Sequence, residues 1–159
     1  AGTIEAHEIP AKPLDPYSYY NGDFIALEKA HLNKGWKLVD NWHPDNKAGK
    51  RNGFVDVPML EATRPGDRLT LDFQGKAIGI FCVSGPSAGI LEYSVDGAPF
   101  KELDTFTEWS HNLYIPWVYM LETELKDMDH KLVLRISKKK NPASQGTECQ
   151  IRNFVVNGR

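Results

Sequence analysis

Alternation between hydrophobic and polar residues dominates the chain from residue 54 onward. It is clearest at residues 68–73, where leucine or phenylalanine at every second position alternates with a polar residue. A period of two is typical of a strand with one buried face and one solvated face. The same pattern, with turn residues between the segments, predicts short strands over residues 35–42, 54–62, 68–73, 77–83, 89–95, 100–103, 113–121, 131–137 and 149–156.

Residues 77–83 depart from this alternation. Ile78, Ile80 and Cys82 occupy one face, and the residues between them, including Phe81 and Val83, are also apolar or small. A strand that is apolar on both faces is normally covered on both faces. We therefore predict a central strand with another segment over its outer side, and the tyrosine-bearing residues 17–22 are one candidate for that cover.

Turn residues separate the predicted strands. Asp96-Gly97 is a strong hairpin signal, because both central positions of a type I′ turn need a positive φ. Pro65-Gly66 suits a type II turn, and residues 85–89 predict a surface loop. Residues 23–34 form the one plausible helix, with Asp23 as its cap and Gly35 after its end. An irregular strand and loop is the alternative for that segment.

These elements define a fold class and a domain division. Many short strands and at most one short helix predict an all-β, antiparallel β-sandwich. Long polar loops at 43–53 and 138–147 favour a jelly roll over an immunoglobulin sandwich. Residues 1–22 contain three prolines and predict a lead-in segment docked on the domain, with a short edge strand at residues 3–9. Residues 23–159 form a single β-sandwich domain.

Composition and charge indicate which classes of partner the chain does not suit. The 159 residues carry 19 basic and 21 acidic side chains, for a net charge of −2. That balance predicts no nucleic-acid partner, and no apolar run approaches the length of a membrane span. The first residues lack the pattern of a signal peptide. Cys82 and Cys149 leave two alternatives open, which are two buried free thiols or one disulfide.

No complete catalytic, metal or cofactor motif is present. The chain has no G-x-S-x-G elbow, and its five histidines are scattered without the spacing of metal ligands. We therefore expect no catalytic residues, no metal ligands and no cofactor. A single structural Ca²⁺ held by carbonyls and carboxylates stays open. One alternative is a small hydrolase that uses His43 with Asp45, or His111, as its base.

Aromatic residues beside polar residues in turns are the remaining candidates for a site. One group consists of Trp109, Ser110, His111, Asn112 and Tyr114. A second group contains Trp42 and His43. Flat rings beside hydrogen-bonding groups are suited to sugars, which stack their C–H faces and hydrogen-bond through their hydroxyls. Tryptophans of a sandwich commonly belong to its core, and Trp109 is the one we expect to be presented to solvent.

The segments GIFCVSGPSAGILEYSVDGAPFKELDTFTEWS, LYIPW, KLVLRIS and CQIRNF together resemble the accessory β-sandwich domain of bacterial SGNH (GDSL-type) hydrolases. The resemblance implies a galactose-binding-type jelly roll. It also implies a secreted, periplasmic or cell-envelope setting, and an SGNH hydrolase domain of the same polypeptide as partner. The catalytic serine, aspartate and histidine of that family belong to the hydrolase domain, and none of their motifs is matched here.

The resemblance and the residues together favour one function. We predict a non-catalytic accessory domain of a secreted esterase of the lipase/acylhydrolase type, which supports the hydrolase domain, with carbohydrate binding as an open addition. A stand-alone carbohydrate-binding module and the small hydrolase are the alternatives. The hydrolase domain becomes a second candidate for the cover over residues 77–83.

Overall fold

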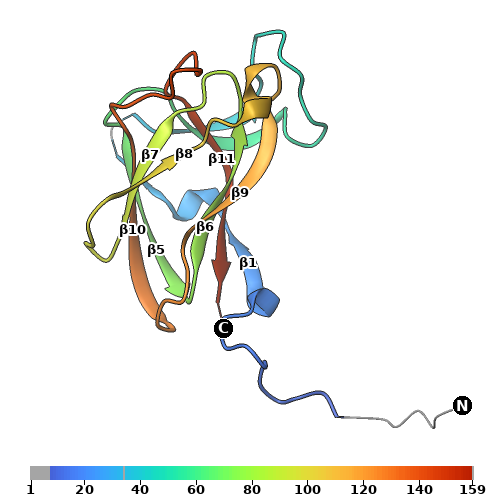
Figure 1. Ribbon diagram of the computed structural model, residues 1–159, viewed down its shortest axis with the longest axis vertical. Helices are drawn as coiled ribbons and strands as arrows, with labels where there is room; N and C mark the ends of the chain where they lie inside the picture. Colours follow the sequence, from blue (N-terminus) through green and yellow to red (C-terminus); the bar gives the residue numbers. More distant parts are fainter. Residues whose placement is uncertain (1–7, 34, 159) are drawn as a thin grey trace, which may run out of the picture.

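The computed structural model, which describes residues 8–33 and 35–158, is a sandwich of two antiparallel sheets (Figure 1). The six-stranded sheet has the order β3 (Lys37–Trp42), β4 (Val57–Ala62), β11 (Cys149–Asn157), β6 (Ile78–Ser84) and β9 (Ile115–Glu122), and β1 (Gly22–Ile25) also pairs with β11. The five-stranded sheet has the order β2 (His31–Leu32), β5 (Arg68–Gly75), β10 (Met128–Ile136), β7 (Ile90–Val95) and β8 (Lys101–Asp104). The predicted all-β jelly-roll sandwich is confirmed.

The core lies between the two sheets and follows from the alternation in the sequence. Leu69 and Leu71 on β5 lie opposite Leu134 and Leu132 on β10, and all four are fully buried. Ile80 on β6 lies on the facing sheet of the same core. Within the described residues both cysteines are buried, free thiols, so the first of the two alternatives for them holds.

The last strand, β11, organises the six-stranded sheet. Its first part, Cys149 to Ile151, pairs with β4, and its last part, Phe154 to Asn157, pairs with β1. Its other edge pairs with β6. Three strands from distant parts of the chain therefore form backbone hydrogen bonds with this one strand.

Strand β6 is central, as predicted, and its outer face is covered over one half. Val83 is buried in a second, smaller core with Trp42, Met59 and Tyr114. Next to them the ring of Phe54 lies edge-on to Phe81, with the ring centroids 5.3 Å apart. The cover thus includes Phe54, from the connection between β3 and β4. The expected strand over residues 54–62 begins only at residue 57, since Phe54 and Val55 pack against the small core and Asp56 has a φ of 58°.

The helix predicted over residues 23–34 is wrong. The segment contains β1, a single 3-10 turn η2 (Leu27–Lys29) and the short strand β2. Phe24 pairs with Val155 of β11, so backbone pairing with the finished sheet replaces helical hydrogen bonds. Leu27 alone of the η2 turn reaches the core. Tertiary context overrides weak local propensity in such a short segment.

Two predicted turns are confirmed. Asp96 and Gly97 have φ angles of 53° and 77°, and the Ala98 N–H donates to the Val95 carbonyl at 3.0 Å, as a type I′ turn requires. At the other turn Gly66 has a φ of 87°. Pro116 lies in β9, which is an edge strand of its sheet. A proline is tolerated there because an edge strand leaves some backbone N–H groups unpaired.

The lead-in contacts the sandwich close to η1 (Tyr19–Asn21), and the residues before it extend away (Figure 1). Lys76 Nζ donates to the Pro16 carbonyl at 3.0 Å, and Asn157 Nδ2 donates to the Ser18 carbonyl at 3.0 Å. The edge strand predicted at residues 3–9 lies outside the described residues apart from its last two, which are not in a strand. Within the described ranges, no helix has the length and apolar character that a membrane span requires.

Candidate functional site

A polar groove of about 490 Å³ lies along β3, β4 and the start of β11. Charged, amide and hydroxyl side chains dominate its walls. It is lined by Lys37, Val39, Asn41, Trp42, His43, Pro44, Asp45, Asn46, Glu61, Ser87, Tyr114, Glu148 and Gln150. Three of the predicted site residues, Trp42, His43 and Tyr114, are therefore brought together here.

Trp42 forms a wall of this groove and not an open platform. Its ring is buried, and it lies edge-on to Tyr114 with the ring centroids 5.4 Å apart. Its indole N–H donates to Glu61 Oε1 at 3.1 Å, and Lys37 Nζ lies 2.9 Å from Glu61 Oε2. Glu61 is thereby fixed at the groove wall, with a cation beside it.

His43 is paired with a different carboxylate from the one the sequence places beside it. Its Nδ1 lies 3.0 Å from Asp56 Oδ1, and both side chains are largely exposed. Asp56 has a φ of 58°, which is held by its N–H donating to the Trp42 carbonyl at 2.8 Å. Among the described residues no serine, threonine or cysteine side chain hydrogen-bonds to the ring of His43 or His111.

Tyr114 is positioned by a glycine. A Cβ on Gly85 would lie 2.1 Å from the Tyr114 ring, so only glycine lets the ring pack over the loop after β6. The Tyr114 hydroxyl accepts a hydrogen bond from Asn46 Nδ2 at 2.7 Å. Burial raises the pKa of Tyr114. The phenol therefore stays protonated at neutral pH and keeps a hydroxyl hydrogen to donate.

Glu148 and Gln150 complete the groove from β11 and the residue before it. Gln150 Nε2 donates to Glu148 Oε2 at 3.3 Å. Burial, together with the nearby Glu61 carboxylate, raises the pKa of Glu148. The groove thus combines carboxylate acceptors with ammonium, amide and phenol groups within one hollow. This donor and acceptor set suits a ligand rich in hydroxyl groups.

The remaining predicted residues lie in and after the 3-10 turn η3 (Glu108–His111). Trp109 is 58% exposed, the most of the four tryptophans. Ser110 is buried and caps the turn through Thr107. His111 packs edge-on against Phe106 with the centroids 5.0 Å apart. The Asn112 carbonyl accepts a hydrogen bond from the Gly49 N–H at 2.7 Å.

This second group divides into structural residues and one presented ring. The turn η3 and the connection between β3 and β4 lie at the same end of the sandwich (Figure 1). Ser110 and Asn112 use polar groups to hold that end together, whereas Trp109 projects from it. Within residues 8–33 and 35–158 no cluster of histidine, cysteine and acidic side chains forms a metal site.

Sequence reasoning did not identify the strand residues of the groove, Lys37, Glu61, Glu148 and Gln150. Glu148 and Gln150 flank a cysteine that points into the core, so the alternation places both on the outer face. A search for polar residues at outward positions of neighbouring strands could have found them. The neighbourhood of those strands, however, depends on the sheet order, which the sequence does not reveal.

Comparison with solved structures defines the fold. The sandwich superposes on a two-domain esterase active on acetylated mannans with a TM-score of 0.69 at 17% identity, covering 96% of this chain and 40% of that chain. A second structure of a two-domain esterase active on acetylated mannans gives a TM-score of 0.68, with 99% and 41% of the two chains covered. This chain therefore spans about two fifths of the length of these esterases.

Similar folds occur in other polysaccharide-active proteins. An exo-β-1,3-galactanase from Phanerochaete chrysosporium gives a TM-score of 0.53 at 11% identity, over 84% of this chain and 29% of that chain. A Paenibacillus xanthan lyase gives 0.52 at 16% identity, over 99% of this chain and 14% of that chain. No protein-family model matches the chain, and no curated protein sequence matches it. These likenesses show that the chain has a β-sandwich fold that also occurs as part of two-domain esterases, a galactanase and a xanthan lyase.

Proposed function

We propose that this chain is the non-catalytic accessory β-sandwich domain of a secreted, SGNH/GDSL-type carbohydrate esterase. The observation that carries the proposal is the likeness to a two-domain esterase over 96% of this chain but only 40% of that one. The remaining length would hold the hydrolase domain, which would supply the nucleophile and base. The sequence motifs that resemble SGNH hydrolase accessory domains support the same assignment.

The geometry around the two candidate bases agrees with a non-catalytic role. A base must lie within hydrogen-bonding reach of the proton it abstracts, which requires a nucleophile or water site beside it. His111 packs on the Phe106 ring, and although Asp56 pairs with Nδ1 of His43 as an orienting carboxylate would, no serine, threonine or cysteine side chain hydrogen-bonds to either ring among the described residues. Asp45, the expected partner of His43, lines the groove. The hydrogen bond of His43 goes to Asp56 instead.

An esterase assay tests this proposal. The 159-residue chain should not hydrolyse p-nitrophenyl acetate above the buffer rate, whereas the polypeptide that includes the adjacent hydrolase domain should. The gene should encode a G-D-S-type serine motif next to this chain. Turnover by the isolated chain that is lost in His43→Ala or His111→Ala would refute the proposal and support the small hydrolase.

Carbohydrate binding in the polar groove is a second candidate function. The groove presents hydrogen-bonding groups from three strands and from the connections between them, and η3, which carries Trp109, lies at the same end of the sandwich. Mannan oligosaccharides such as mannopentaose are the ligands to test first, because the similar two-domain esterases act on acetylated mannans and one was crystallised with that sugar. A hexose offers hydroxyls for Glu61 and Asn46 and a C–H face for an aromatic ring.

Calorimetry with mannopentaose separates the two parts of this surface. If the groove binds the sugar, Asn46→Ala should weaken binding roughly tenfold, the equivalent of about 1.4 kcal/mol. Trp109→Ala tests the presented ring, and Trp117→Ala, which removes a tryptophan that is 46% exposed on β9, is the matched control. Equal affinities for the wild-type chain and the Asn46→Ala variant would exclude the groove as the sugar site.

A further inference from the structure

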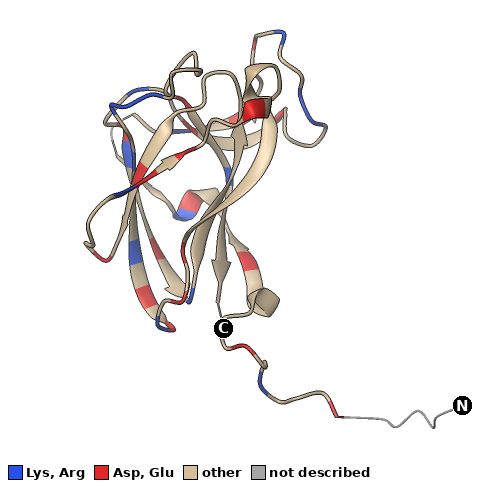
Figure 2. Ribbon diagram, viewed as in Figure 1, with Lys and Arg blue, Asp and Glu red and all other residues tan. Residues whose placement is uncertain are grey.

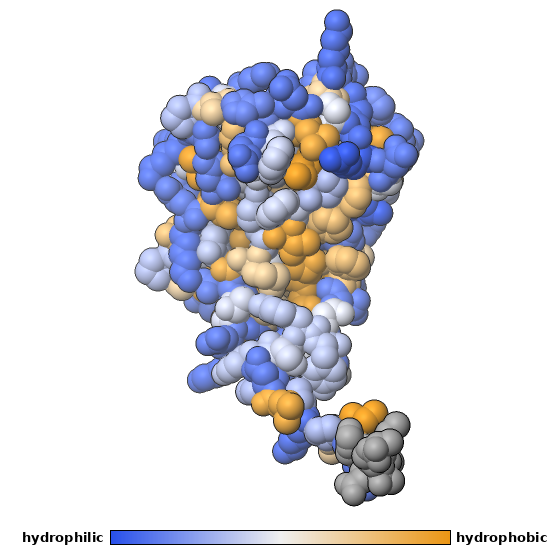
Figure 3. Space-filling view, turned by 45° about the vertical axis from the view of Figure 1, so that its right-hand side comes forward, coloured by the Kyte–Doolittle hydropathy of each residue, from blue (hydrophilic) through white to orange (hydrophobic). Residues whose placement is uncertain are grey.

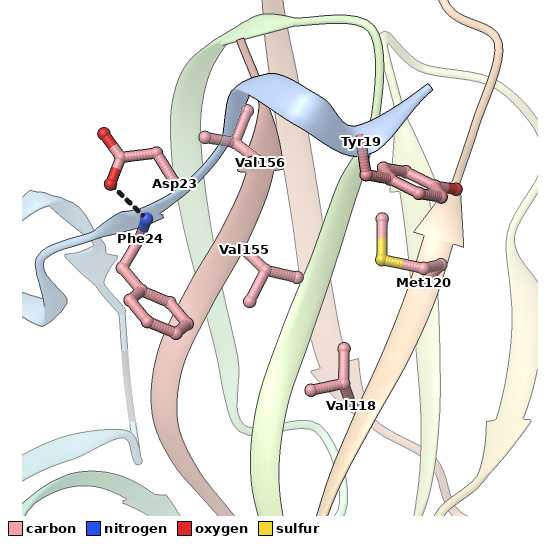
Figure 4. A pocket seen from close by; sticks show the side chains of 8 residues that line it. Tyr19, Asp23, Phe24, Val118, Met120, Val155 and Val156 are labelled. Atoms are coloured by element: carbon pink, nitrogen blue, oxygen red, sulfur yellow. Dashed lines mark hydrogen bonds between the residues drawn. The ribbon is translucent and has the colours of Figure 1, made fainter. Parts of the chain in front are cut away.

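A shallow apolar groove of about 360 Å³ lies on the outer face of the six-stranded sheet, at the opposite end of β6 from the small core (Figure 4). Phe24 of β1 and Val155 of β11 form one side, and Val118 and Met120 of β9 form the other. Tyr19 of η1 closes one end. Figure 3 shows that hydrophobic residues gather on this face above the point where the lead-in joins the sandwich.

Between the two sides of the groove, β6 contributes a glycine in place of a residue with a side chain. Gly79 lies between Val155 of β11 and Met120 of β9 in the sheet register. A Cβ there would approach Val155 Cγ2 to 2.8 Å and Met120 Sδ to 3.0 Å, besides meeting the Tyr119 carbonyl at 2.5 Å. Gly79 is itself buried, and the Val155 and Met120 side chains on either side of it line the groove.

This half of the sheet differs sharply from the half that the chain itself covers. Val83 is buried beneath Trp42 and Tyr114, whereas Phe24, Val118 and Met120 are 59%, 47% and 37% exposed. Figure 2 shows charged residues along β5 and β10 of the other sheet, while β6 and β9 are almost free of them. The one carboxylate at the rim is that of Asp23, which accepts a hydrogen bond from the Phe24 N–H.

We infer that this apolar groove is the surface on which the hydrolase domain of the same polypeptide docks. The inference rests on the proposed function, and it specifies which face is used. The partner surface must be apolar at its centre and must offer an N–H donor or a cation near Asp23. Burying Phe24, Val118 and Met120 removes apolar surface from water, which is the main favourable contribution to such a contact.

The lead-in favours this occupant over an unrelated protein. Tyr19 belongs both to the end of the lead-in and to the wall of the groove. The hydrogen bonds from Lys76 and Asn157 fix Pro16 and Ser18 at the same end. The C-terminal end of β11 lies at this same end of the sandwich (Figure 1), so a domain attached through the lead-in or after β11 is held close to the groove at a high effective concentration, and a modest affinity is enough for docking. Interfaces between domains of one chain commonly resemble transient protein–protein interfaces of modest affinity.

Thiol labelling tests the inference with two matched positions. Val118 and Met128 are 47% and 49% exposed, and both lie in strands, but Met128 is in β10 of the other sheet. In the isolated chain, Val118→Cys and Met128→Cys should react with a maleimide at similar rates. In the two-domain polypeptide, Val118→Cys should react about tenfold more slowly, as expected for a millimolar effective concentration and a dissociation constant near 0.1 mM, while Met128→Cys should not change.

A second substitution shows whether protection comes from this contact. Adding Met120→Glu to the Val118→Cys polypeptide should restore fast labelling, because a carboxylate in the apolar contact is costly to desolvate. Adding Met128→Glu should not restore it. Restoration by Met120→Glu alone supports docking at the groove.

The possible failures are distinguishable. If the gene encodes no hydrolase domain beside this chain, the proposed function itself fails. If the hydrolase domain is present but Val118→Cys remains as reactive in the two-domain polypeptide as in the isolated chain, the proposed function stands and the docking surface is wrong. If labelling of the isolated chain slows as its concentration rises, the groove binds a second copy of this chain, and that result also overturns the inference.

Discussion

The imidazole of His130 lies between two acceptors at the start of β10. Its Nδ1 is 2.6 Å from Asp96 Oδ2, and its Nε2 is 2.8 Å from the Lys126 carbonyl. Because both partners accept, the doubly protonated ring satisfies both bonds. Burial acts to lower the pKa of His130, but the Asp96 carboxylate and the Lys126 carbonyl outweigh it and raise that pKa overall. The His130 imidazole in turn lowers the pKa of Asp96.

The variant Asp96→Asn should show this coupling as a pH-dependent loss of stability. The His130 contribution is complete below its ordinary pKa of 6.5 and is lost as the pH rises through the raised folded value. The Asp96 contribution is complete above 3.8 and is lost as the pH falls through the lowered folded value. Asparagine also tolerates a positive φ, so the turn is kept. Between pH 3.8 and pH 6.5 we expect the variant to lose about 1 kcal/mol of unfolding free energy.

Urea unfolding at pH 5.5 and pH 9 measures this effect. The difference between wild type and Asp96→Asn should be larger at pH 5.5, and the NMR titration of His130 should move to lower pH in the variant. Asp129→Asn removes an exposed carboxylate that acts on His130 through its charge and not through a hydrogen bond, so it should move the His130 titration to lower pH by less than Asp96→Asn does and should change the stability little. An equal loss of stability at the two pH values would contradict the coupling.

The variant Glu148→Gln should be more stable than the wild type at neutral pH. The pKa of Glu148 is raised by burial and by Glu61, so the folded state binds this proton more tightly than the unfolded state does. Stability therefore falls as the pH rises above the ordinary value of 4.5, and a neutral side chain avoids that loss. Denaturation at pH 7 and pH 4 should show a gain that is smaller at pH 4. Glu28→Gln, an exposed control, should show neither effect.

At the scale of elements, the junction between the lead-in and the sandwich depends on the last strand. Asn157 Nδ2 donates to the Ser18 carbonyl, while its Oδ1 is buried without a hydrogen-bond partner. The side chain therefore anchors η1 with one of its two polar atoms. The contact also places Tyr19 against the apolar groove.

Asn157→Ala should loosen this junction. Removing the hydrogen bond should cost about 1 kcal/mol of unfolding free energy. The peptide bonds between residues 16 and 22 should also become more sensitive to limited proteolysis. Asn153→Ala, in the same strand, removes an amide for which no hydrogen bond is found in the described structure, and it serves as the control. Unchanged cleavage in Asn157→Ala would show that η1 is held by other contacts.

The strands could be predicted from the sequence because each carries its own pattern. Residues 68–73 alternate, and the structure has β5 there; Asp96-Gly97 predicted its turn from backbone geometry alone. The segment 23–34 failed because its structure comes from pairing with β11, which lies more than 120 residues away. Trp42 and Tyr114 could be proposed as site residues from their local sequence. The polar strand residues beside them could not, because their neighbourhood depends on which strands pair in the sheet.

At the scale of the whole molecule, the two sheets share one core, so we expect them to unfold together. Cys82 and Cys149 lie in that core on the paired strands β6 and β11, so the reactivity of their thiols measures whether the core has opened. Burial raises the pKa of Cys82 to about 12 and raises that of Cys149 as well, so neither thiol is ionised at neutral pH. Both thiols should therefore be unreactive in the folded protein.

Maleimide labelling followed by mass spectrometry tests the shared transition. Both cysteines should become labelled at one rate, and the dependence of that rate on urea should match the fluorescence change of the tryptophans. Faster labelling of Cys149 alone in native buffer would mean that β11 opens locally. That outcome would contradict a single cooperative unit.

The position of β11 also has a consequence for how the protein is made. Residues 149–157 pair with β1 and β4 along one edge and with β6 along the other, and they place Ile151 and Phe154 in the core. During synthesis the ribosome releases these residues after every other strand of the sandwich. At about 15 residues per second, β1 must therefore wait for roughly nine seconds and β9 for roughly two seconds before β11 is complete. A chaperone has that interval in which to bind, and the sandwich closes only when its last strand arrives.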